Sequence, residues 1–368
     1  MRPILKNQCV SVKVIAEAGV NHNGDIAMAI ALVDAAADAG ADIVKFQTYK
    51  ASNIASATAP KARYQVGATE QRETQLEMLK RLELTPEHHF KIREHCELRK
   101  IAFLSTPFDM ESLGFLVDKM DVSHIKIASG EITNGPLLLA AARTGKPVLL
   151  STGMCLLGEI EEALMLLAWG MSHPTGYPSR QSVRKSFLDD HVWFELRDRV
   201  TLLHCTTEYP TPTAEVNLRA IQSLSNAFGL LVGFSDHSEG IVMPIAAVAM
   251  GACMVEKHFT LDRSLPGPDH KASLEPPELA AMVNGIRSVE AGLGPGVKRP
   301  TSSEEANRTI ARKSLVAARS IPGGAVLQES DFTTKRPGTG VSPMRVWEFI
   351  GQTATRAYSP DEMLDGSP

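Results

Sequence analysis

The chain has 368 residues, 43% of them hydrophobic and 22% charged, which suits a soluble globular protein with one large domain and a small one. Its 38 basic and 42 acidic residues leave a net charge of −4, so the composition gives no global attraction to nucleic acid. Residues 1–6 lack the apolar core of a signal peptide, and no apolar run is long enough to span a membrane. We therefore expect a cytoplasmic protein with neither a membrane nor a nucleic-acid partner.

The cysteines are odd in number and widely scattered. There are five of them, Cys9, Cys96, Cys155, Cys205 and Cys253. Because no CxxC pair occurs, the sequence indicates neither a zinc ribbon nor a disulfide framework.

Short apolar runs alternate with helical patterns over residues 1–292. Eight strands are predicted, at residues 12–16, 43–46, 102–105, 124–128, 148–150, 201–204, 231–234 and 254–256. The main helical patterns cover residues 26–39, 87–99, 112–119, 135–144, 159–169, 218–228, 242–250 and 277–291. Eight strands followed by helices predict an α/β fold of the (β/α)8 TIM-barrel type, whose active sites lie at the C-terminal strand ends. A doubly wound open sheet is the main alternative, but no GxGxxG follows the first strand.

Two insertions and a tail depart from this alternation. Residues 50–81 predict a polar loop with a short helix, and residues 171–199 predict a surface flap or interface element rather than a catalytic one. After the barrel at 1–292, the glycines, prolines and polar residues of 293–312 indicate an extended linker. Residues 313–368 then form a small domain with little core of its own, which we expect to pack against its own barrel or a partner's.

Polar residues close nearly every predicted strand, although the strands themselves are apolar. They are Glu17, Lys45, Gln47, Thr106, Lys126, Ser129, Ser151, residues 204–207, Ser235, His237, Glu256 and His258. The mouth of a barrel explains such a set. Either lysine alone would more often form a surface salt bridge, but together with the hydroxyls they suit an anionic phosphate or carboxylate.

Two histidine segments follow neighbouring strands, at residues 235–238 and 256–259. The strand–helix–strand unit that carries them must be parallel and right-handed, which brings His237 and His258 to the same ends of adjacent strands. Either histidine alone would more often be structural. As a pair, followed by Asp269 and His270 and without a thiolate, they suit an octahedral ion such as Mn²⁺ or Mg²⁺. Zinc would normally take a third protein ligand.

Glu17 ends the first predicted strand. A carboxylate there, beside lysine and metal, is a candidate general base. Its alternative role is a buried partner of Lys45 or Lys126. Asp25 is expected to cap the helix that follows.

Motifs along nearly the whole chain resemble the sialic acid synthase family, which includes N-acetylneuraminate and legionaminic acid synthases. They are AEAGVNHNG at 16–24, KFQT at 45–48, STPFD at 105–109, KIASGE at 126–131, STGM at 151–154, SDH at 235–237, EKHFT at 256–260, GPDH at 267–270 and KRPG at 335–338. The resemblance implies a metal-dependent transferase that condenses phosphoenolpyruvate with an N-acylated mannosamine-type sugar and water. The products are a nine-carbon 2-keto sugar acid and phosphate, released by C–O cleavage. It also implies a C-terminal antifreeze-like (SAF, β-clip type) domain that reaches the partner's barrel in a domain-swapped homodimer.

The resemblance implies a role for each matching residue. The catalytic residues would be Glu17, His237 and His258, and the two histidines would hold the metal, Mn²⁺ by preference with Mg²⁺ or Co²⁺ as alternatives. Phosphoenolpyruvate would be bound by Lys45, Thr106, Lys126, Ser129, Ser151 and Ser235. The sugar would be bound by Gln47, Thr207, Tyr209, Asp269 and Arg336, the last from the other subunit.

One motif differs from the usual family pattern. Sialic acid synthases commonly carry Asn near the end of the sixth strand, where this chain has Thr206 and Thr207. Together with the insertion at 171–199, this is more similar to legionaminic acid synthases, whose substrate is 2,4-diacetamido-2,4,6-trideoxymannose rather than N-acetylmannosamine. Two other functions stay open: an aldolase with a Schiff base on Lys126 or Lys45, and a non-catalytic polysaccharide-associated protein of the same fold.

Overall fold

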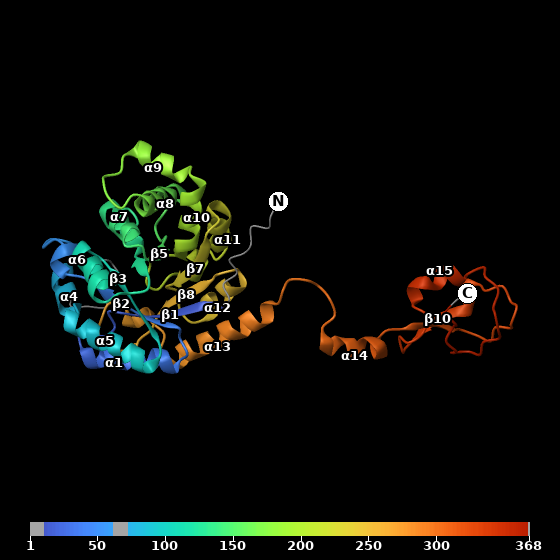
Figure 1. The fold of residues 1–368 in the computed structure, drawn as a ribbon. Helices are drawn as coiled ribbons and strands as arrows, with labels where there is room; N and C mark the ends of the chain where they lie inside the picture. Colours follow the sequence, from blue (N-terminus) through green and yellow to red (C-terminus); the bar gives the residue numbers. More distant parts are fainter. Residues whose placement is uncertain (1–10, 62–72, 367–368) are drawn as a thin grey trace. The chain divides into compact units, whose positions relative to one another are not determined.

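The computed structural model describes residues 11–61 and 73–366. Cys9, the signal-peptide prediction for residues 1–6 and the middle of the insertion at 50–81 therefore fall wholly or partly outside the described residues. The chain divides into two compact units, Met1–Gly294 and Pro295–Pro368 (Figure 1).

Eight parallel strands form the centre of the first unit. They are β1 (Lys13–Gly19), β2 (Ile43–Thr48), β3 (Ala102–Pro107), β4 (Ile125–Ile127), β5 (Val148–Ser151), β6 (Val200–Cys205), β7 (Leu231–Asp236) and β8 (Met254–His258). Their order in the sheet is β3-β2-β1-β8-β7-β6-β5-β4, and β3 also lies against β4, which makes a nearly closed barrel. The prediction of a (β/α)8 barrel is confirmed, and all eight predicted strands are present in the described part of the chain.

Alternation along the strands builds the inside of this barrel in layers. An apolar floor is formed by Ile15, Leu104, Leu149, Leu203 and Met254, from five different strands. Side chains on one face of a strand recur every second residue. The residues two positions further along are Glu17, Thr106, Ser151, Cys205 and Glu256, which all line one cavity. The sequence therefore places a polar layer directly above the apolar floor.

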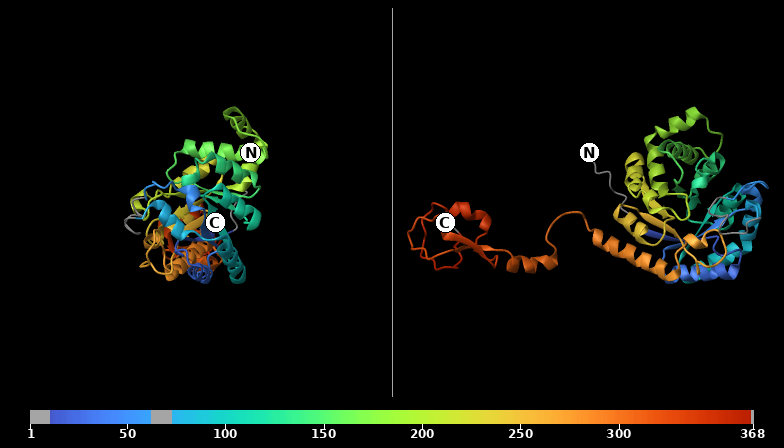
Figure 2. Two further views of the ribbon diagram at one scale, coloured as in Figure 1. Left: turned by 90° about the vertical axis from the view of Figure 1, so that its left-hand side faces the viewer. Right: turned by 180° about the vertical axis from the view of Figure 1, so that it is seen from behind.

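Helices surround the strands (Figures 1 and 2). They are α1 (Ile26–Asp38), α5 (Pro86–Arg99), α6 (Met110–Gly114) continued by a π-helical turn (Phe115–Lys119), α7 (Gly135–Arg143), α8 (Leu157–Ser172), α11 (Ala220–Phe228), α12 (Val242–Ala249) and α13 (Pro276–Leu293). Helix α1 is typical: Asp25 caps it, as predicted, and Ala29, Leu32, Val33 and Ala36 form its buried stripe. Two apolar cores fill the space between strands and helices, one around β1, β2 and β8 and one around β4–β7.

The two insertions are more helical than predicted. After β2 the described residues form α2 (Ala51–Ile54) and α4 (Gln75–Leu82), joined in a small apolar cluster with Val20 and Tyr49. The insertion at 171–199 forms α9 (Arg180–Phe187) and α10 (Asp190–Arg199), which pack against α8.

The second unit contains helix α14 (Ser302–Ala311) and a two-stranded antiparallel sheet of β9 (Ser314–Ala317) and β10 (Phe332–Lys335). The prediction of an extended linker is wrong for residues 302–311, because a capping box between Thr301 and Glu304 starts a helix that contains no Gly or Pro. The small domain also has a core, formed by Leu315, Ala317, Ile321, Leu327, Val341, Phe349, Ala354, Tyr358 and Leu364. The short helix α15 (Val346–Phe349) contributes to it.

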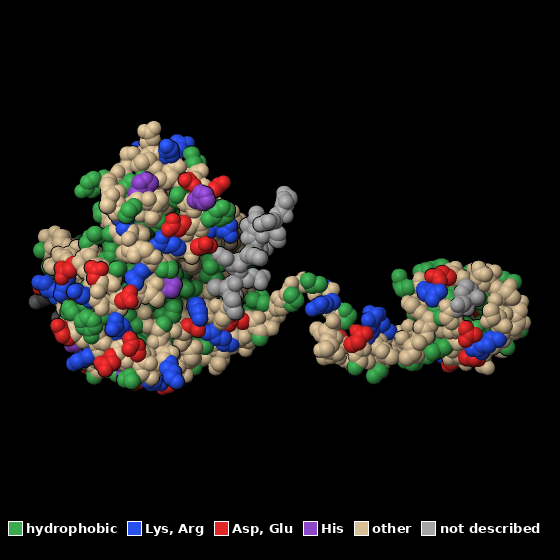
Figure 3. Space-filling model, in the orientation of Figure 1, with side chains coloured by type: hydrophobic (Ala, Val, Ile, Leu, Met, Phe, Trp, Pro, Cys, Tyr) green, Lys and Arg blue, Asp and Glu red, His purple; other side chains and the backbone are tan. Residues whose placement is uncertain are grey.

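Two further observations concern the helices and the charged surface. No helix in the described ranges is long and apolar enough to cross a membrane. Basic and acidic side chains are interspersed on the face of the barrel drawn in Figure 3, which agrees with the small net charge.

Candidate active site

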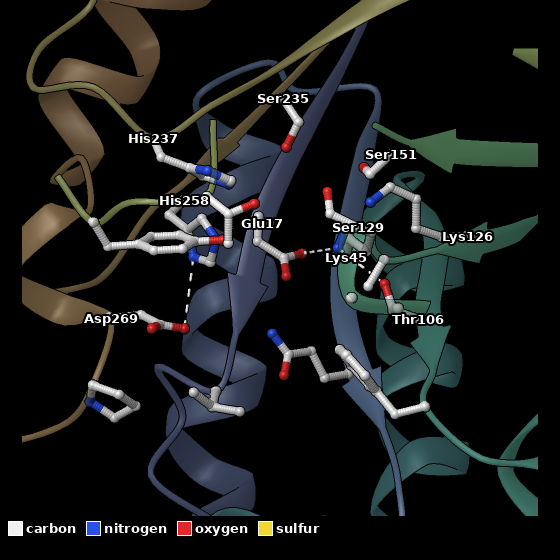
Figure 4. Close-up of a pocket in the computed structure, with 18 of the residues that line it drawn as sticks. Glu17, Lys45, Thr106, Lys126, Ser129, Ser151, Ser235, His237, His258 and Asp269 are labelled. Atoms are coloured by element: carbon white, nitrogen blue, oxygen red, sulfur yellow. Dashed lines mark hydrogen bonds and ion pairs between the residues drawn. The ribbon is translucent and has the colours of Figure 1, made fainter. Parts of the chain in front are cut away.

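A cavity of about 320 Å³ opens at the C-terminal ends of the strands and gathers nearly all the predicted site residues. Those that line it are Glu17, Lys45, Gln47, Thr106, Lys126, Ser129, Ser151, Thr207, Tyr209, Ser235, His237, His258 and Asp269 (Figure 4). Arg336 belongs to the C-terminal unit, where it is exposed and its Nε donates to the carbonyl oxygen of Ala311 at 3.0 Å.

Two lysines and two glutamates form the buried polar layer of this cavity. Lys45 Nζ lies 2.8 Å from Glu17 Oε2 and 3.6 Å from Glu256 Oε2, and Lys126 Nζ lies 3.4 Å from Glu256 Oε1. Lys45 also donates to Thr106 Oγ1 at 3.1 Å, and Ser235 donates to Glu256 at 2.7 Å. The formal charges cancel, and every member is buried.

The two glutamates have opposite pKa shifts. Burial raises the pKa of Glu17 to about 7, with repulsion from Glu256 adding to it and attraction to Lys45 opposing it. Burial also acts to raise the pKa of Glu256, but attraction to Lys126 and Lys45 and the Ser235 hydrogen bond outweigh it and hold the pKa at about 2. Glu17 is therefore poised to exchange a proton near neutral pH, whereas Glu256 stays ionised.

Glycine keeps the space around Glu17 open. Gly19 has φ +53°, and a Cβ there would come within 3.3 Å of Glu17 Oε1 and 3.5 Å of His258 Cε1. The strand register is irregular between Glu17 and Gly19, where β1 pairs with β2. Position 19 therefore requires glycine, which adopts positive φ readily and has no side chain to contact Glu17 or His258.

The two histidines face each other at the ends of adjacent strands. β7 and β8 pair in parallel, with Asp236 opposite Lys257, and the His237 and His258 ring centroids are 5.6 Å apart. His237 Nδ1 is 2.6 Å from the carbonyl oxygen of Thr206, which fixes the proton on Nδ1 and leaves Nε2 with a free lone pair. Burial lowers the pKa of His237 to about 4 and that of His258 well below its usual value, so both rings are neutral.

These features fit two ligands of a divalent ion. His258 Nδ1 is buried without a hydrogen-bond partner, and Asp269 Oδ2 lies 3.8 Å from it. Residues 11–61 and 73–366 contain no group of three or more His, Cys, Asp or Glu side chains arranged to hold an ion. The histidine pair would thus need oxygen ligands from water or substrate to complete a coordination sphere.

The wall beside the histidines carries the residues predicted to bind sugar. Tyr209 packs on His237, with ring centroids 4.1 Å apart, and edge-on against His258 at 5.6 Å. Burial raises the pKa of Asp269 to about 6. Thr207 Oγ1 is buried without a hydrogen-bond partner, as is Ser151 Oγ. Buried polar atoms are normally paired, so these orphan groups indicate a site that awaits a polar ligand.

The sequence pattern assigns no role to two kinds of lining residue. Glu256 closes a predicted strand, and its place in the cavity, two residues beyond Met254, follows from the strand period. Apolar residues from the first insertion also line the cavity, namely Ile54, Met78, Leu79 and Leu82, together with Val20, Tyr49 and Phe108. Their helical apolar spacing looks like an ordinary core stripe, so only the tertiary structure reveals them.

Comparison with known proteins relates both units to described families. The NeuB family model matches residues 32–298, and the SAF domain model matches residues 312–367. The N,N'-diacetyllegionaminic acid synthase of Campylobacter jejuni is 49% identical over 351 residues, which cover 95% of this chain and 98% of that protein. The N,N'-diacetyllegionaminic acid synthase of Legionella pneumophila is 43% identical, over 95% of this chain and 92% of that protein.

A solved structure has the same architecture. The N-acetylneuraminic acid synthetase from Leptospira borgpetersenii, in complex with citrate, is 34% identical with a TM-score of 0.65. The likeness covers 81% of this chain and 90% of that one.

Proposed function

Because the chain belongs to the NeuB family, we propose that it is a nonulosonic acid synthase, which condenses phosphoenolpyruvate with an N-acylated mannosamine-type sugar and water. The product is a nine-carbon 2-keto sugar acid, and inorganic phosphate leaves. One observation carries this proposal: the buried lysine–glutamate layer and the facing histidine pair share one cavity at the barrel mouth.

The polar layer suits a small phosphorylated acid. Lys45 and Lys126 supply two buried ammonium groups, and the hydroxyls of Thr106, Ser129, Ser151 and Ser235 line the same space. Charge-assisted hydrogen bonds of this kind hold phosphate and carboxylate groups in place.

The reaction can be written with the chain's own groups. C3 of the enol forms a bond with the aldehyde carbon of the open-chain sugar, and positive charge develops at C2. The aldehyde oxygen takes up a proton and becomes a hydroxyl. Water then adds at C2 and loses one proton, the C2–O bond to phosphate breaks, and the new C2 hydroxyl loses its proton to the departing phosphate as the ketone forms. Glu17, with a pKa of about 7, is suited to take the proton of that water, and Lys45 at 2.8 Å would stabilise the carboxylate until then.

His237 and His258 would hold a divalent ion, Mn²⁺ by preference, with Mg²⁺ or Co²⁺ as alternatives. Such an ion supplies a Lewis acid that polarises a carbonyl oxygen. Its binding can be measured apart from activity, from the loss of the free Mn²⁺ resonance in electron paramagnetic spectra. We expect His237→Ala to bind no Mn²⁺, so that the free-ion resonance keeps its full intensity, because one of the two imidazoles is removed. The control variant His95→Gln, which changes a histidine paired with Asp34, should bind Mn²⁺ like the wild type. Equal binding by His237→Ala would remove the pair from the metal site.

Arg336 would come from a second copy of the chain. The proposal is a domain-swapped homodimer, in which the guanidinium of Arg336 contacts the N-acyl group of the sugar bound by the partner's barrel. Arg offers several directed donors, which suit an amide oxygen. Its exposure in the C-terminal unit is consistent with contact to another molecule.

The preferred sugar would be 2,4-diacetamido-2,4,6-trideoxymannose, giving a legionaminate, rather than N-acetylmannosamine, giving N-acetylneuraminate. Two relatives with 49% and 43% identity are named for the legionaminic acid product. The unpartnered hydroxyl of Thr207 provides a hydrogen-bonding group that could serve the second acetamido group.

Phosphate release with each sugar tests this function. We expect turnover that requires both phosphoenolpyruvate and sugar, with higher kcat/KM for the diacetamido sugar. ¹⁸O in the bridging C–O bond should leave with phosphate. Label retained in the keto acid would contradict C–O cleavage, and equal rates with both sugars would contradict the role of Thr207.

One observation favours an aldolase as the second candidate. Burial lowers the pKa of Lys126, as a Schiff-base lysine requires. Borohydride with pyruvate separates the two functions: an aldolase is trapped as a covalent adduct, whereas the synthase leaves the chain unmodified.

A further inference from the structure

One side of the cavity is apolar, and none of its residues has a role in the reaction proposed above. This apolar wall comprises Val20, Tyr49, Ile54, Met78, Leu79, Leu82 and Phe108. Ile54 ends α2, and Met78, Leu79 and Leu82 lie on α4, so most of the wall comes from the insertion after β2.

The wall lies beyond the reacting layer along the direction of the strands. Val20 follows Glu17 by three residues, Tyr49 follows Lys45 by four, and Phe108 follows Thr106 by two. Parallel strands run from the floor of a barrel toward its mouth, so residues later in each segment lie nearer the opening. A sugar whose aldehyde carbon is at the polar layer would extend its far end toward this wall.

The wall is anchored to the barrel. Tyr49 and Phe108 meet edge to face at 6.3 Å, and Tyr49 Oη donates to the carbonyl oxygen of Leu79 at 3.3 Å. Gly24 has φ +79°, and a Cβ there would come within 2.5 Å of the carbonyl oxygen of Arg81, so the first loop touches the end of α4. Ala51 N donates to Glu83 at 2.9 Å, which fixes the start of α2.

Such a wall offers little to a hydroxyl group. The one hydroxyl it contains, on Tyr49, donates to the carbonyl oxygen of Leu79, and the other six side chains have no polar hydrogen-bonding group except the weak acceptor sulfur of Met78. Gln47 and Gln75 also line the cavity. A hydroxymethyl group placed against the wall would lose water without gaining a partner, whereas a methyl group would gain apolar contact.

We propose that the apolar wall binds a methyl-terminated end of the sugar and makes the enzyme selective for 6-deoxy over 6-hydroxy substrates. This inference rests on the proposed function, and it assigns the selectivity to Leu79 and Ile54 in particular, because both are half-buried and line the cavity. An apolar pocket discriminates only moderately against an added hydroxyl, so we expect a preference of about 10- to 100-fold in kcat/KM.

The test uses two sugars that differ only at C6, 2,4-diacetamido-2,4,6-trideoxymannose and 2,4-diacetamido-2,4-dideoxymannose. Leu79→Gln puts an amide into the wall and keeps a good helix-forming residue. We expect it to reduce the ratio of kcat/KM for the 6-deoxy over the 6-hydroxy sugar by roughly tenfold. Ile54→Thr, on the other helix, should reduce the ratio in the same direction and serves if Leu79→Gln does not fold.

Leu76→Gln is the matched control, because Leu76 packs in the same small cluster on α4 but does not line the cavity. Its ratio should stay within about twofold of the wild-type value. A wild-type ratio near one, or an unchanged ratio in a folded wall variant, would overturn the inference while leaving the synthase function intact. Failure of the wild-type enzyme to consume either sugar with phosphoenolpyruvate would instead overturn the proposed function, and the inference with it.

Discussion

Lys45 and Lys126 share one buried layer with two glutamates, yet their surroundings differ. Lys45 contacts both Glu17 and Glu256, which raise its pKa against the effect of burial, whereas the pKa of Lys126 is lowered by burial despite attraction to Glu256. Lys45 Nζ lies near both carboxylates, whereas Lys126 Nζ lies 3.4 Å from Glu256 alone, so Lys126 is the less tightly paired of the two for an incoming anion.

Replacing Lys126 should weaken binding of phosphoenolpyruvate. Lys126→Met removes a charge-assisted contact of about 1.5–3 kcal/mol, so we expect KM for phosphoenolpyruvate to rise roughly 10- to 100-fold. Steady-state phosphate release at saturating sugar measures this. Lys146→Met is the control, because Lys146 pairs with an exposed aspartate outside the cavity. An unchanged KM for phosphoenolpyruvate in Lys126→Met would exclude Lys126 from the anion site.

His22 is a buried histidine in the first loop that should make stability depend on pH. Burial, with a smaller contribution from repulsion by His89, His88 and His270, lowers its pKa to about 3, and its Nδ1 accepts from Gly24 N at 3.0 Å. Between pH 6.5 and pH 3 the unfolded chain therefore binds a proton that the folded chain does not, and stability falls as pH falls through this window.

The expected slope from His22 is about 1.4 kcal/mol for each pH unit within that window. His22→Gln lacks the titrating group, so its Tm should fall less steeply than that of the wild type between pH 6.5 and pH 4.5, even if it starts lower. Scanning fluorimetry at a series of pH values measures both curves. Parallel curves would show that His22 is protonated in the folded protein, contrary to this account.

At the level of elements, an ion pair joins the two strands that carry the histidines. Lys257 is fully buried, and its Nζ lies 2.6 Å from Asp236 Oδ2 and also donates to the carbonyl oxygen of Ser238. Asp236 Oδ1 in turn accepts from Ser238 N at 2.9 Å. Each partner precedes a histidine by one residue, so the pair fixes the ends of β7 and β8 against each other.

Removing one partner should leave an uncompensated buried charge. Lys257→Met is expected to cost about 3 kcal/mol or more, because the buried Asp236 carboxylate then lacks its cationic partner. The double variant Lys257→Met with Asp236→Asn should recover part of that loss, since both charges are gone. Thermal unfolding compares the three proteins. A double variant less stable than Lys257→Met alone would contradict the explanation by unpaired charge.

The strand elements could be predicted well from the sequence, and the wall elements could not. Buried parallel strands are continuous apolar runs that end in polar residues, so the positions of Glu17, Lys45 and His258 followed from the pattern. Helix α4 has an apolar stripe like any other, and no local feature distinguishes Leu79, which faces the cavity, from Leu76, which does not. That distinction depends on how the insertion docks, which is tertiary information.

On the scale of the whole molecule, the chain is two compact units with separate cores. The change in composition after residue 292 predicted the division, but the helix at residues 302–311 depends on one capping box within an otherwise polar segment. Among the predicted site residues, only Arg336 lies in the second unit. Its role is therefore a question about assembly rather than about the barrel.

Complementation between two defective chains tests that role. Glu17→Gln disables the barrel site, and Arg336→Ala disables the residue proposed to act on the partner. In a swapped heterodimer, the barrel with Glu17→Gln receives residue 336 from the Arg336→Ala chain, so that site has both defects. The other barrel has Glu17 and receives the native Arg336, so that site has neither defect. Heterodimers purified through two different tags should thus recover about half of the wild-type activity, although each parent alone is nearly inactive.

The alternatives predict different results in the same experiment. If Arg336 acted on the barrel of its own chain, each site of the heterodimer would keep one defect, and activity would stay at the level of the parents. If the chain were a monomer, the two tags would not copurify. A pairing of Glu17→Gln with Lys126→Met is the control: both residues lie in the barrel, so no site of that heterodimer is intact and no recovery is expected. Recovery specific to the Arg336 pairing would therefore require that the C-terminal unit of one chain completes the cavity of another.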